Sequence, residues 1–482
     1  MVNRRKFMGT LAGIGATAAL PHEARAQQKE LKQLEVSKPN GLNLIIIISD
    51  TFRWDYLHLN GVNERIQTPN LDALASESVY FSNCYADSLP SIPARRVIHT
   101  GKSIITKNPK WAPLLPDDVT IAQIINKTGS FTEGLISDFV FYFAPTEVYQ
   151  PTFSFNQGFN GFYWIRGNVH DSYITGPRSS ITDAERHLPE HYMTDSLRER
   201  LFQYLLDNKD NTSEDDYCCA RVCRTAGKWL EDNKDNNGPF MLFVDMFDPH
   251  EPWDAPPEYT KMYRKDFSGD RYLIDYDAKL DAITEEDTAI LTDHYAAEVT
   301  FVDRCIGRLI SDVKRLGLRD TTIIVFTSDH GTHLGEMGCV MKQSKLCNSA
   351  VTRVPLIIRH PDNSFSGKRI DALTGHVDFT PTFLSLLGVE TNMSFDGQNM
   401  WDLVTGTKTK LRDYIVTNYG SYGSVHTHKW HYFQHVRKDD EGFGPQLYDV
   451  VNDHAEEKNV VKDYPEAATG LKQILKNVHE VR

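Results

Sequence analysis

Polar side chains that could bind a divalent metal follow two of the apolar stretches in this sequence. Asp50 comes just after the apolar run 42–48, and Asp329 and His330 come just after the apolar run 322–326. Carboxylate and imidazole ligands without any thiolate suit Ca²⁺, Mg²⁺ or Mn²⁺ rather than a structural zinc ion. We therefore predict that Asp50, Asp329 and His330 hold one divalent metal ion.

A candidate nucleophile, Ser91, stands at the start of a predicted helix. Pro93 and the apolar residues after it favour a helix that begins at Ser91, since Pro is common in the first turn. The unpaired N–H groups and the dipole of a helix N-terminus favour an anion. Arg95 lies one helical turn beyond Ser91, so we expect this cation near the same anion.

The elements that position these residues alternate between strands and helices. Continuous apolar runs predict buried parallel strands at 42–48, 240–246 and 322–326. Helical patterns cover 68–76, 120–127, 220–233 and 285–316. The alternation predicts an α/β fold with a large, mostly parallel sheet flanked by helices. Because ligands bind beyond the carboxyl ends of such strands, the polar residues there should meet at one edge.

The chain is predicted to have three parts. Residues 1–26 have the features of a Tat-type signal peptide: twin arginines, a short apolar stretch and the small-x-small site Ala24-Arg25-Ala26. A catalytic domain is expected at 27–365. Shorter strand-like pieces, including 414–418 and 430–436, and a closing amphipathic helix from Tyr464 predict a smaller C-terminal α+β subdomain at 366–482.

Export follows from the first of these parts. The apolar stretch of the signal is too short to span a membrane, and no other segment is long and apolar enough. We therefore expect a periplasmic or secreted protein that uses the Tat export machinery and has no membrane span.

The composition is that of an acidic globular protein. The chain has 482 residues, 52 Lys plus Arg against 65 Asp plus Glu, and a formal net charge of −13. This balance argues against a nucleic-acid partner, which would need a dominant basic surface. The seven cysteines follow no metal-ligand spacing. We expect Cys218, Cys219 and Cys223, on a predicted helix, to be core thiols; a disulfide between two of the others stays open. The charged stretch 183–216 is expected to be a surface excursion.

The residues around Ser91 resemble a known signature. The run Ser91-Ile92-Pro93-Ala94-Arg95, continuing to Thr100-Gly101-Lys102, resembles that of type I sulfatases in the alkaline phosphatase superfamily. In that signature a Cys or Ser before x-Pro-Ser/Ala-Arg is oxidised to formylglycine. Other stretches resemble the family's motifs in the same order, and they include Asp50-Thr51-Phe52-Arg53-Trp54-Asp55, Asp248-Pro249-His250-Glu251-Pro252-Trp253, Ser328-Asp329-His330-Gly331, Lys342 and Arg353-Val354-Pro355-Leu356.

The resemblance implies an alkaline-phosphatase-like fold and a formylglycine mechanism. Oxidised Ser91 would complete the metal shell, with one Ca²⁺ ion expected rather than Mn²⁺ or Mg²⁺. One hydroxyl of the hydrated aldehyde would attack sulfur and displace the alcohol, and the other would drive release of sulfate. A Ser-type precursor implies a dedicated formylglycine maturase that acts on the unfolded chain before export.

The resemblance also implies roles for the nearby cations. Arg95 would steady the hydrate, and Lys342 would bind sulfate. His250 would protonate the leaving oxygen, since a His can carry that proton near neutral pH. Lys102 is a further candidate for contact with the substrate.

Two departures from the family pattern keep alternatives open. Thr51 stands where many sulfatases have a second Asp, and His330 stands where Asn is frequent. That ligand set also resembles phosphonate monoester hydrolases, so a phosphonate monoester or phosphodiester hydrolase is the alternative. The usual Gly-Lys-x-His segment is missing, and residues 135–141 stand in its region. We expect Asp138 there to pair with a cation. Because this Lys and His are missing, a non-catalytic glycan-binding protein is a further alternative. The other site residues are intact, which argues against it.

A sulfated saccharide is the expected substrate. Arg166 and Asp171 could hydrogen-bond sugar hydroxyls, and Trp253, like Trp164 and Trp430, could stack on a pyranose face or pack in the core. Export favours a sulfated carbohydrate from the environment, such as an oligosaccharide from a sulfated polysaccharide, over an intracellular metabolite.

Overall fold

An eight-stranded sheet forms the centre of the molecule. The computed structural model describes residues 30–104, 114–115, 117–142, 155–168, 170–177, 187, 192–268, 272–274, 283–343, 346–436 and 443–480. The predicted Tat-type signal lies outside these residues. The strands run in the order β13 (Lys368–Ile370), β2 (Val79–Phe81), β12 (Leu356–Arg359), β8 (Thr322–Thr327), β1 (Asn43–Ser49), β7 (Phe240–Met246), β5 (Thr132–Ser137) and β6 (Gly161–Trp164).

The central strands are parallel, as predicted. β1 pairs in parallel with both β7 and β8, and β5 pairs in parallel with β7 and β6. Only β12, which runs antiparallel to β8 and β2, interrupts this arrangement within the sheet. The carboxyl ends of β1, β7 and β8 therefore meet at one edge.

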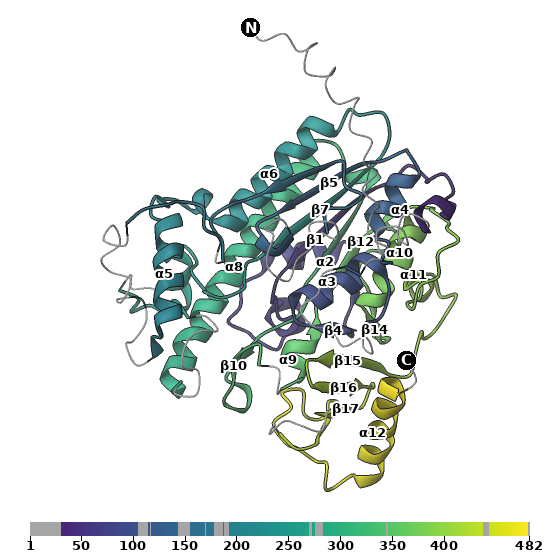
Figure 1. Ribbon diagram of the computed structural model, residues 1–482. Coiled ribbons are helices and arrows are strands. Elements are labelled where there is room, and N and C mark those ends of the chain that lie inside the picture. The colour runs from purple at the N-terminus through teal and green to yellow at the C-terminus, as the bar shows by residue number, and fades with distance from the viewer. Residues whose placement is uncertain are drawn as a thin grey trace, which may run out of the picture.

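Helices cover both faces of the sheet, and every residue of β1 is therefore buried. Side chains alternate across a strand, so Ile45 and Ile47 enter one apolar core, while Ile46 and Ile48 enter another. The first core is closed by α2 (Pro69–Ser76), α6 (Cys218–Asn233) and α8 (Glu285–Arg315). The second is closed by α3 (Ser91–Thr100), α4 (Ile121–Lys127) and α10 (Phe379–Leu386), on the opposite side of the strands (Figure 1).

The predicted helices form close to their expected bounds. α8 begins where Thr284 accepts a hydrogen bond from the Asp287 N–H, with the Asp287 side chain returning to the Thr284 backbone. The charged stretch expected as a surface excursion instead contains α5 (Asp195–Asp207), which buries Leu197 and Leu201 against the first core.

A second, five-stranded sheet joins the C-terminal part of the chain to the residues before Ser91. Its order is β18 (Gln446–Asp449), β17 (Trp430–His435), β16 (Tyr422–His426), β15 (Ile415–Tyr419) and β4 (Ser88–Leu89). β4 pairs in parallel with β15. The closing helix α12 (Pro465–Glu480) packs on β16 and β17, beside the sheet in Figure 1.

The chain enters this second sheet well after residue 366. β13 still belongs to the large sheet, and α10 still contacts α3. The division into 27–365 and 366–482 stays a prediction.

All seven cysteines are buried and unbridged, and Cys218, Cys219 and Cys223 are core thiols as predicted. The sulfur atoms of Cys219 on α6 and Cys305 on α8 lie 3.5 Å apart. Among the described residues, no helix is long and apolar enough to cross a membrane.

Candidate functional site

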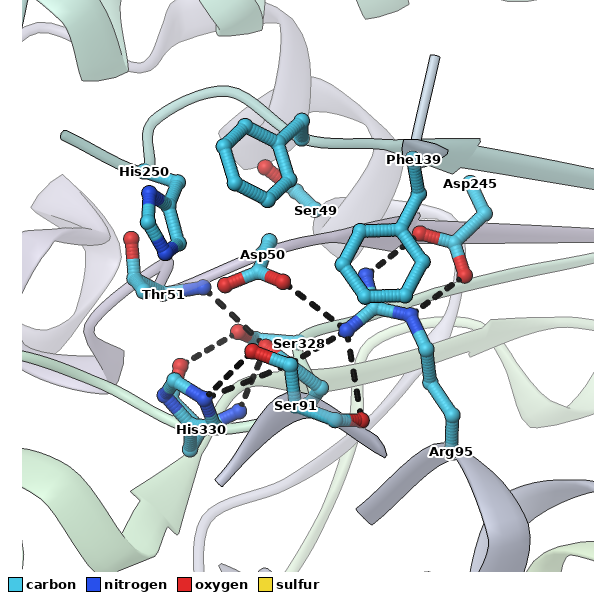
Figure 2. Close-up of polar contacts among 12 residues, drawn as sticks. Ser49, Asp50, Thr51, Ser91, Arg95, Phe139, Asp245, His250, Ser328 and His330 are labelled. Carbon is cyan, nitrogen blue, oxygen red and sulfur yellow. Dashed lines mark hydrogen bonds and ion pairs between the residues drawn. The ribbon is translucent and has the colours of Figure 1, made fainter. Parts of the chain in front are cut away.

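The three predicted metal ligands meet at the carboxyl edge of the large sheet. Asp50 directly follows β1, and Asp329 and His330 follow β8. Each side chain is fully buried, and one ligand atom from each lies within 4.8 Å of the others. Ser91 begins α3 as predicted, and its Oγ lies 3.1 Å from His330 Nε2 (Figure 2).

The donor set fits a divalent cation. The Oδ1 atom of Asp50 is buried without a hydrogen-bond partner, and burial together with Asp329 raises the pKa of Asp50 well above its usual value. A bound cation would satisfy that oxygen and offset the repulsion between the two carboxylates. Although burial opposes it, the charges of His330 and Arg95 hold the pKa of Asp329 well below its usual range.

His330 is held in the tautomer that a metal requires. Its Nδ1 lies 2.8 Å from the carbonyl oxygen of Gly331, so Nδ1 carries the proton and donates it. Burial lowers the pKa of His330 to about 4, which keeps the ring neutral near pH 7. The Nε2 lone pair is therefore available toward Ser91 and the metal ligands.

Arg95 bridges the carboxylates of Asp50 and Asp329. Its Nη1 donates to Asp50 Oδ2 at 2.8 Å and to Asp329 Oδ2 at 2.6 Å. Its other nitrogens donate to both oxygens of Asp245, at 2.9 and 2.6 Å. Arg95 is fully buried, and its contact with Ser91 is a 3.4 Å hydrogen bond to the backbone carbonyl.

Asp245 is a site residue that the sequence reasoning missed. It lies within the apolar strand β7, and the alternation of that strand turns it to the same face as Phe243, toward α3. Tyr142 also donates to Asp245, at 2.6 Å, and the Arg95 guanidinium carbon lies 4.0 Å from the centroid of the Phe139 ring. A single carboxylate inside an apolar strand was the available signal.

Thr51 does not take the place of a second carboxylate ligand. Its backbone has φ 60, and its N–H donates to Asp329 Oδ1 at 3.1 Å. The Thr51 hydroxyl donates to the carbonyl of Pro249 at 2.9 Å. Thr51 therefore orients Asp329 through its backbone while its side chain fixes the segment before His250.

His250 and Lys342 line a cavity that reaches Ser91, and Glu251 links them. Lys342 Nζ donates to Glu251 Oε1 at 2.9 Å, and His250 Nδ1 lies 2.7 Å from the Glu251 carbonyl oxygen. The His250 ring stacks on Phe247 at 3.9 Å. Burial and the charge of Lys342 hold the pKa of His250 well below its ordinary value, so the ring is neutral without an anion bound. Glu251 lies in the motif around His250, but no role was predicted for it from the sequence.

Among the residues that the structure describes, no cation pairs with Asp138, contrary to expectation. Its carboxylate accepts hydrogen bonds from Asn168 Nδ2 at 2.7 Å and from the Phe247 N–H at 2.8 Å. Burial and the nearby Asp248 raise the pKa of Asp138 to about 8. Protonation, rather than an ion pair, therefore accommodates this carboxyl group near neutral pH.

Trp253 is a core residue and does not face the cavity. Its side chain is fully buried, Nε1 donates to the Pro249 carbonyl at 2.9 Å, and its ring meets Tyr295 edge-on at 5.5 Å. Trp164 lies under Arg166, and Trp430 packs on Tyr464. The core-packing alternative is the correct one for Trp253.

The other candidate substrate contacts, Lys102, Arg166 and Asp171, are not among the described residues that line the cavity. Lys102 follows the ten-residue helix α3 at its far end, about 15 Å from Ser91 along the helix axis. Arg166 and Asp171 bind each other through two hydrogen bonds of 2.7 and 2.6 Å, which fixes the loop between them. Of that loop, His170 lines the cavity.

Aromatic side chains, which the sequence reasoning did not assign, form much of the cavity wall. Phe139, Phe141, Phe247 and Tyr419 all line it, as does Arg200 from α5. Phe139 and Phe141 belong to the segment where the family's Lys and His are missing. The segment was identified from the sequence, but its part in the wall was not.

Comparison with known proteins identifies the relatives of this chain. A family model described as Sulfatase matches residues 42–389, which is more than half of the chain. A second, described as N-sulphoglucosamine sulphohydrolase, C-terminal, matches residues 335–482.

Relatives with named activities share about a quarter of their residues with this chain. An ulvan-active sulfatase of Formosa agariphila is 26% identical, over 80% of this chain and 69% of that protein. An N-acetylglucosamine-6-O-sulfatase of Bacteroides thetaiotaomicron is 24% identical, over 96% of this chain and 89% of that protein. Among solved structures, the phosphonate monoester hydrolase of Agrobacterium radiobacter has a TM-score of 0.68 at 20% identity, over 91% of this chain and 96% of that one. At that identity the likeness shows the fold alone.

Proposed function

Since this chain belongs to the sulfatase family and is a sulfuric ester hydrolase, we propose that it removes sulfate from a sulfated saccharide at Ser91. The observation that carries this assignment is the 3.1 Å contact between Ser91 Oγ and His330 Nε2, beside Asp50 and Asp329. It puts the residue that this family oxidises against the group of metal ligands, at the bottom of a cavity.

We propose that Asp50, Asp329 and His330 hold one Ca²⁺ ion and that Ser91 is oxidised to formylglycine. The metal would supply positive charge for the sulfate oxygens and for the nucleophilic hydroxyl. The aldehyde hydrate would supply a second hydroxyl on the same carbon, which allows sulfate to leave without a second attack on sulfur.

The remaining roles belong to side chains around the cavity. Lys342 lines the cavity, and its ammonium group can donate to a sulfate oxygen. His250 lines the cavity, and because its Nδ1 is bound to the Glu251 carbonyl, Nε2, 3.6 Å from Glu251 Oε1, is the ring nitrogen left to take up a proton. A bound anion would raise the pKa of His250 and so allow it to protonate the leaving oxygen. Arg95 fixes the two metal-binding carboxylates through its ion pairs.

The saccharide substrate is supported by the named relatives. One of them is active on ulvan, and another acts on the 6-O-sulfate of N-acetylglucosamine. We further propose maturation by a Ser-type formylglycine maturase and Tat export to the periplasm or beyond, as the sequence predicts.

The mass of the peptide that contains Ser91 tests the proposed nucleophile. In protein from its native host, this peptide should be lighter by two hydrogen atoms than the encoded sequence, and Ser91→Ala should abolish turnover while the protein stays folded. An unmodified serine in active protein would contradict the mechanism.

The rival hydrolase is tested with two chromogenic substrates. Nitrophenyl sulfate should be turned over with a higher kcat/KM than a nitrophenyl phosphonate monoester. Dominant phosphonate hydrolysis would overturn the assignment to sulfate esters.

A further inference from the structure

A row of aromatic rings forms one wall of the cavity, and the proposed catalytic groups do not account for it. Ring centroids are 5.4 Å apart for Phe139 and Phe141, and 5.7 Å apart for Phe139 and Phe247. His250 extends the row at one end, 3.9 Å from Phe247, and His170 extends it at the other, 5.6 Å from Phe141. These five rings form a continuous, largely apolar face.

Burial orders this row from the bottom of the cavity to its mouth. Phe139 and Phe247 are buried, as is Ser91, whereas Phe141 is half-buried and His170 is exposed. A ligand whose sulfate reaches Ser91 would therefore place the rest of its structure against Phe141. An apolar ligand face gains free energy when it packs on such rings.

The polar lining selects for anionic groups on the ligand. Among the described residues that line the cavity, the charged or ring-nitrogen side chains are Lys342, Arg200, His170 and His250, and none is a carboxylate or an amide. Sites that bind neutral sugars need acceptors for hydroxyl protons as well as donors. Lys342 and Arg200 can only donate hydrogen bonds, so the ligand must bring acceptors to these two cations.

Arg200 is a cation that a single sulfate group does not require. The sulfate at Ser91 would meet the metal site and Lys342 at the bottom of the cavity, whereas Arg200 is half-buried and comes from α5. A guanidinium at this place suits a carboxylate or a second sulfate, which it can bind through two parallel N–H groups.

The size of the cavity limits how much of a saccharide it can enclose. Its volume is about 350 Å³, near the lower end for ligand pockets. That volume suits one sugar ring with its sulfate and favours a ring at the end of its chain.

We propose that the cavity binds one terminal sulfated sugar that carries a second anionic group, with its apolar face on Phe141 and the second anion on Arg200. This proposal rests on the proposed function of the same site. It makes Arg200 a specificity-determining residue and the reaction an exo-acting one.

Calorimetric binding to the Ser91→Ala protein tests this without requiring turnover. Two pairs of ligands are compared: N-acetylglucosamine 6-sulfate with glucosamine N,6-disulfate, and a 2-sulfated hexose with the matching 2-sulfated hexuronic acid. In at least one pair, the doubly anionic ligand should bind about tenfold more tightly or better, as expected for a hydrogen bond to a charged group.

Single substitutions show which side chain causes that preference. Arg200→Gln should abolish the preference within the pair. Arg198→Gln, two residues away and therefore on the other side of α5, should keep it. Phe141→Ala should weaken both members of the pair by a similar factor, because a ring contact does not distinguish their charges.

The outcomes separate this proposal from the function beneath it. No preference in either pair, or a preference that survives Arg200→Gln, would overturn the proposal. If the ligands show the preference but matured wild-type protein fails to hydrolyse nitrophenyl sulfate, the proposed function fails and the binding assignment stands.

Discussion

The side chain of Asp245, within strand β7, holds Arg95 in place. Both of its oxygens accept hydrogen bonds from Arg95, and all these side chains are fully buried. Asp245→Asn would leave Arg95 partly unpaired in the core and free to shift away from Asp50 and Asp329. We expect stability to fall by about 3 kcal/mol and kcat to fall about 10- to 100-fold, measured by urea unfolding and by turnover of nitrophenyl sulfate.

A neighbouring ion pair provides the control. Arg96 binds Asp118 through two hydrogen bonds of 2.5 and 3.1 Å, and both side chains are buried. Neither residue contacts the metal-ligand group, so Asp118→Asn should lower stability and leave kcat near the wild-type value. Equal losses of kcat in both variants would show that the effect is general destabilisation.

Asp138 should make stability depend on pH. Its pKa is raised to about 8 by burial and by Asp248. Between pH 6 and pH 8 the folded carboxyl keeps a proton that the unfolded chain, with an ordinary pKa near 4, has lost. Stability therefore falls as pH rises toward 8, and Asp138→Asn should reduce that fall by about 2–3 kcal/mol. Urea unfolding at the two pH values measures it.

The control for this titration is the exposed Asp195 at the start of α5. Asp195→Asn should leave the difference between pH 6 and pH 8 as it is in the wild type. A wild-type difference that persists unchanged in Asp138→Asn would mean that other groups cause it.

The sequence predicted the group of candidate metal ligands because strand ends and motif order both indicated Asp50, Asp329 and His330. Asp50, Asp329 and His330 each follow an apolar strand, and Ser91 starts a helix. Glu251 and Asp245 were not assigned because their partners, Lys342 and Arg95, are distant along the chain and only the fold brings them together. A lone carboxylate inside an apolar strand was the only signal for Asp245, whereas Glu251 lay in the motif already identified around His250.

At the scale of elements, the segment after β7 folds around Trp253. The indole donates to Pro249 and packs on Tyr295, so it fixes the backbone that carries His250. Trp253→Ala should therefore lower stability by about 3–5 kcal/mol and lower kcat, since His250 would lose its support. Unfolding by urea and steady-state kinetics measure these effects.

The milder variant separates packing from substrate contact. Trp253→Phe keeps much of the apolar volume and loses the N–H donor, so the KM for a saccharide substrate should stay within about twofold of the wild type. A large rise in KM with unchanged stability would return Trp253 to the substrate-binding residues.

Element prediction succeeded where hydrophobic periodicity was long and unbroken. The strands β1, β7 and β8 formed at their expected places because every residue in them is buried, and α8 because it has a buried face from Leu291 to Val313. α5 was missed because its charged residues dominate the composition, although Leu197, Leu201 and Leu205 recur at helical spacing. Arg200 was missed with it.

At the scale of the whole molecule, the cavity is built by both sheets. Ser91 lies just after β4, which pairs with β15 at the edge of the five-stranded sheet. Tyr419, at the end of β15, lines the cavity. The sequence indicated that the predicted strands become shorter after about residue 366. It could not show that the five-stranded sheet includes β4, which lies far earlier in the chain. Such pairing between residues 88–89 and 418–419 is a long-range contact without a local signal.

The acidic balance of the chain should act on large substrates more than on small ones. The formal net charge is −13, and net charge governs long-range attraction or repulsion rather than contacts within a pocket. A long sulfated polymer would be repelled at low salt, where the screening length is about 30 Å, and less so at physiological salt, where it is about 8 Å. A singly sulfated short fragment carries little charge for this field to act on.

We therefore expect kcat/KM on a long sulfated polymer to rise several-fold as NaCl increases from about 0.01 to about 0.15 M. Over the same range, kcat/KM on a monosulfated monosaccharide should change little or fall slightly, because salt also screens its contact with Lys342. Parallel assays of the two substrates at matched sulfate-ester concentration measure the difference. Polymer turnover that fails to improve with salt would mean that the acidic surface lies away from the path by which substrate reaches Ser91.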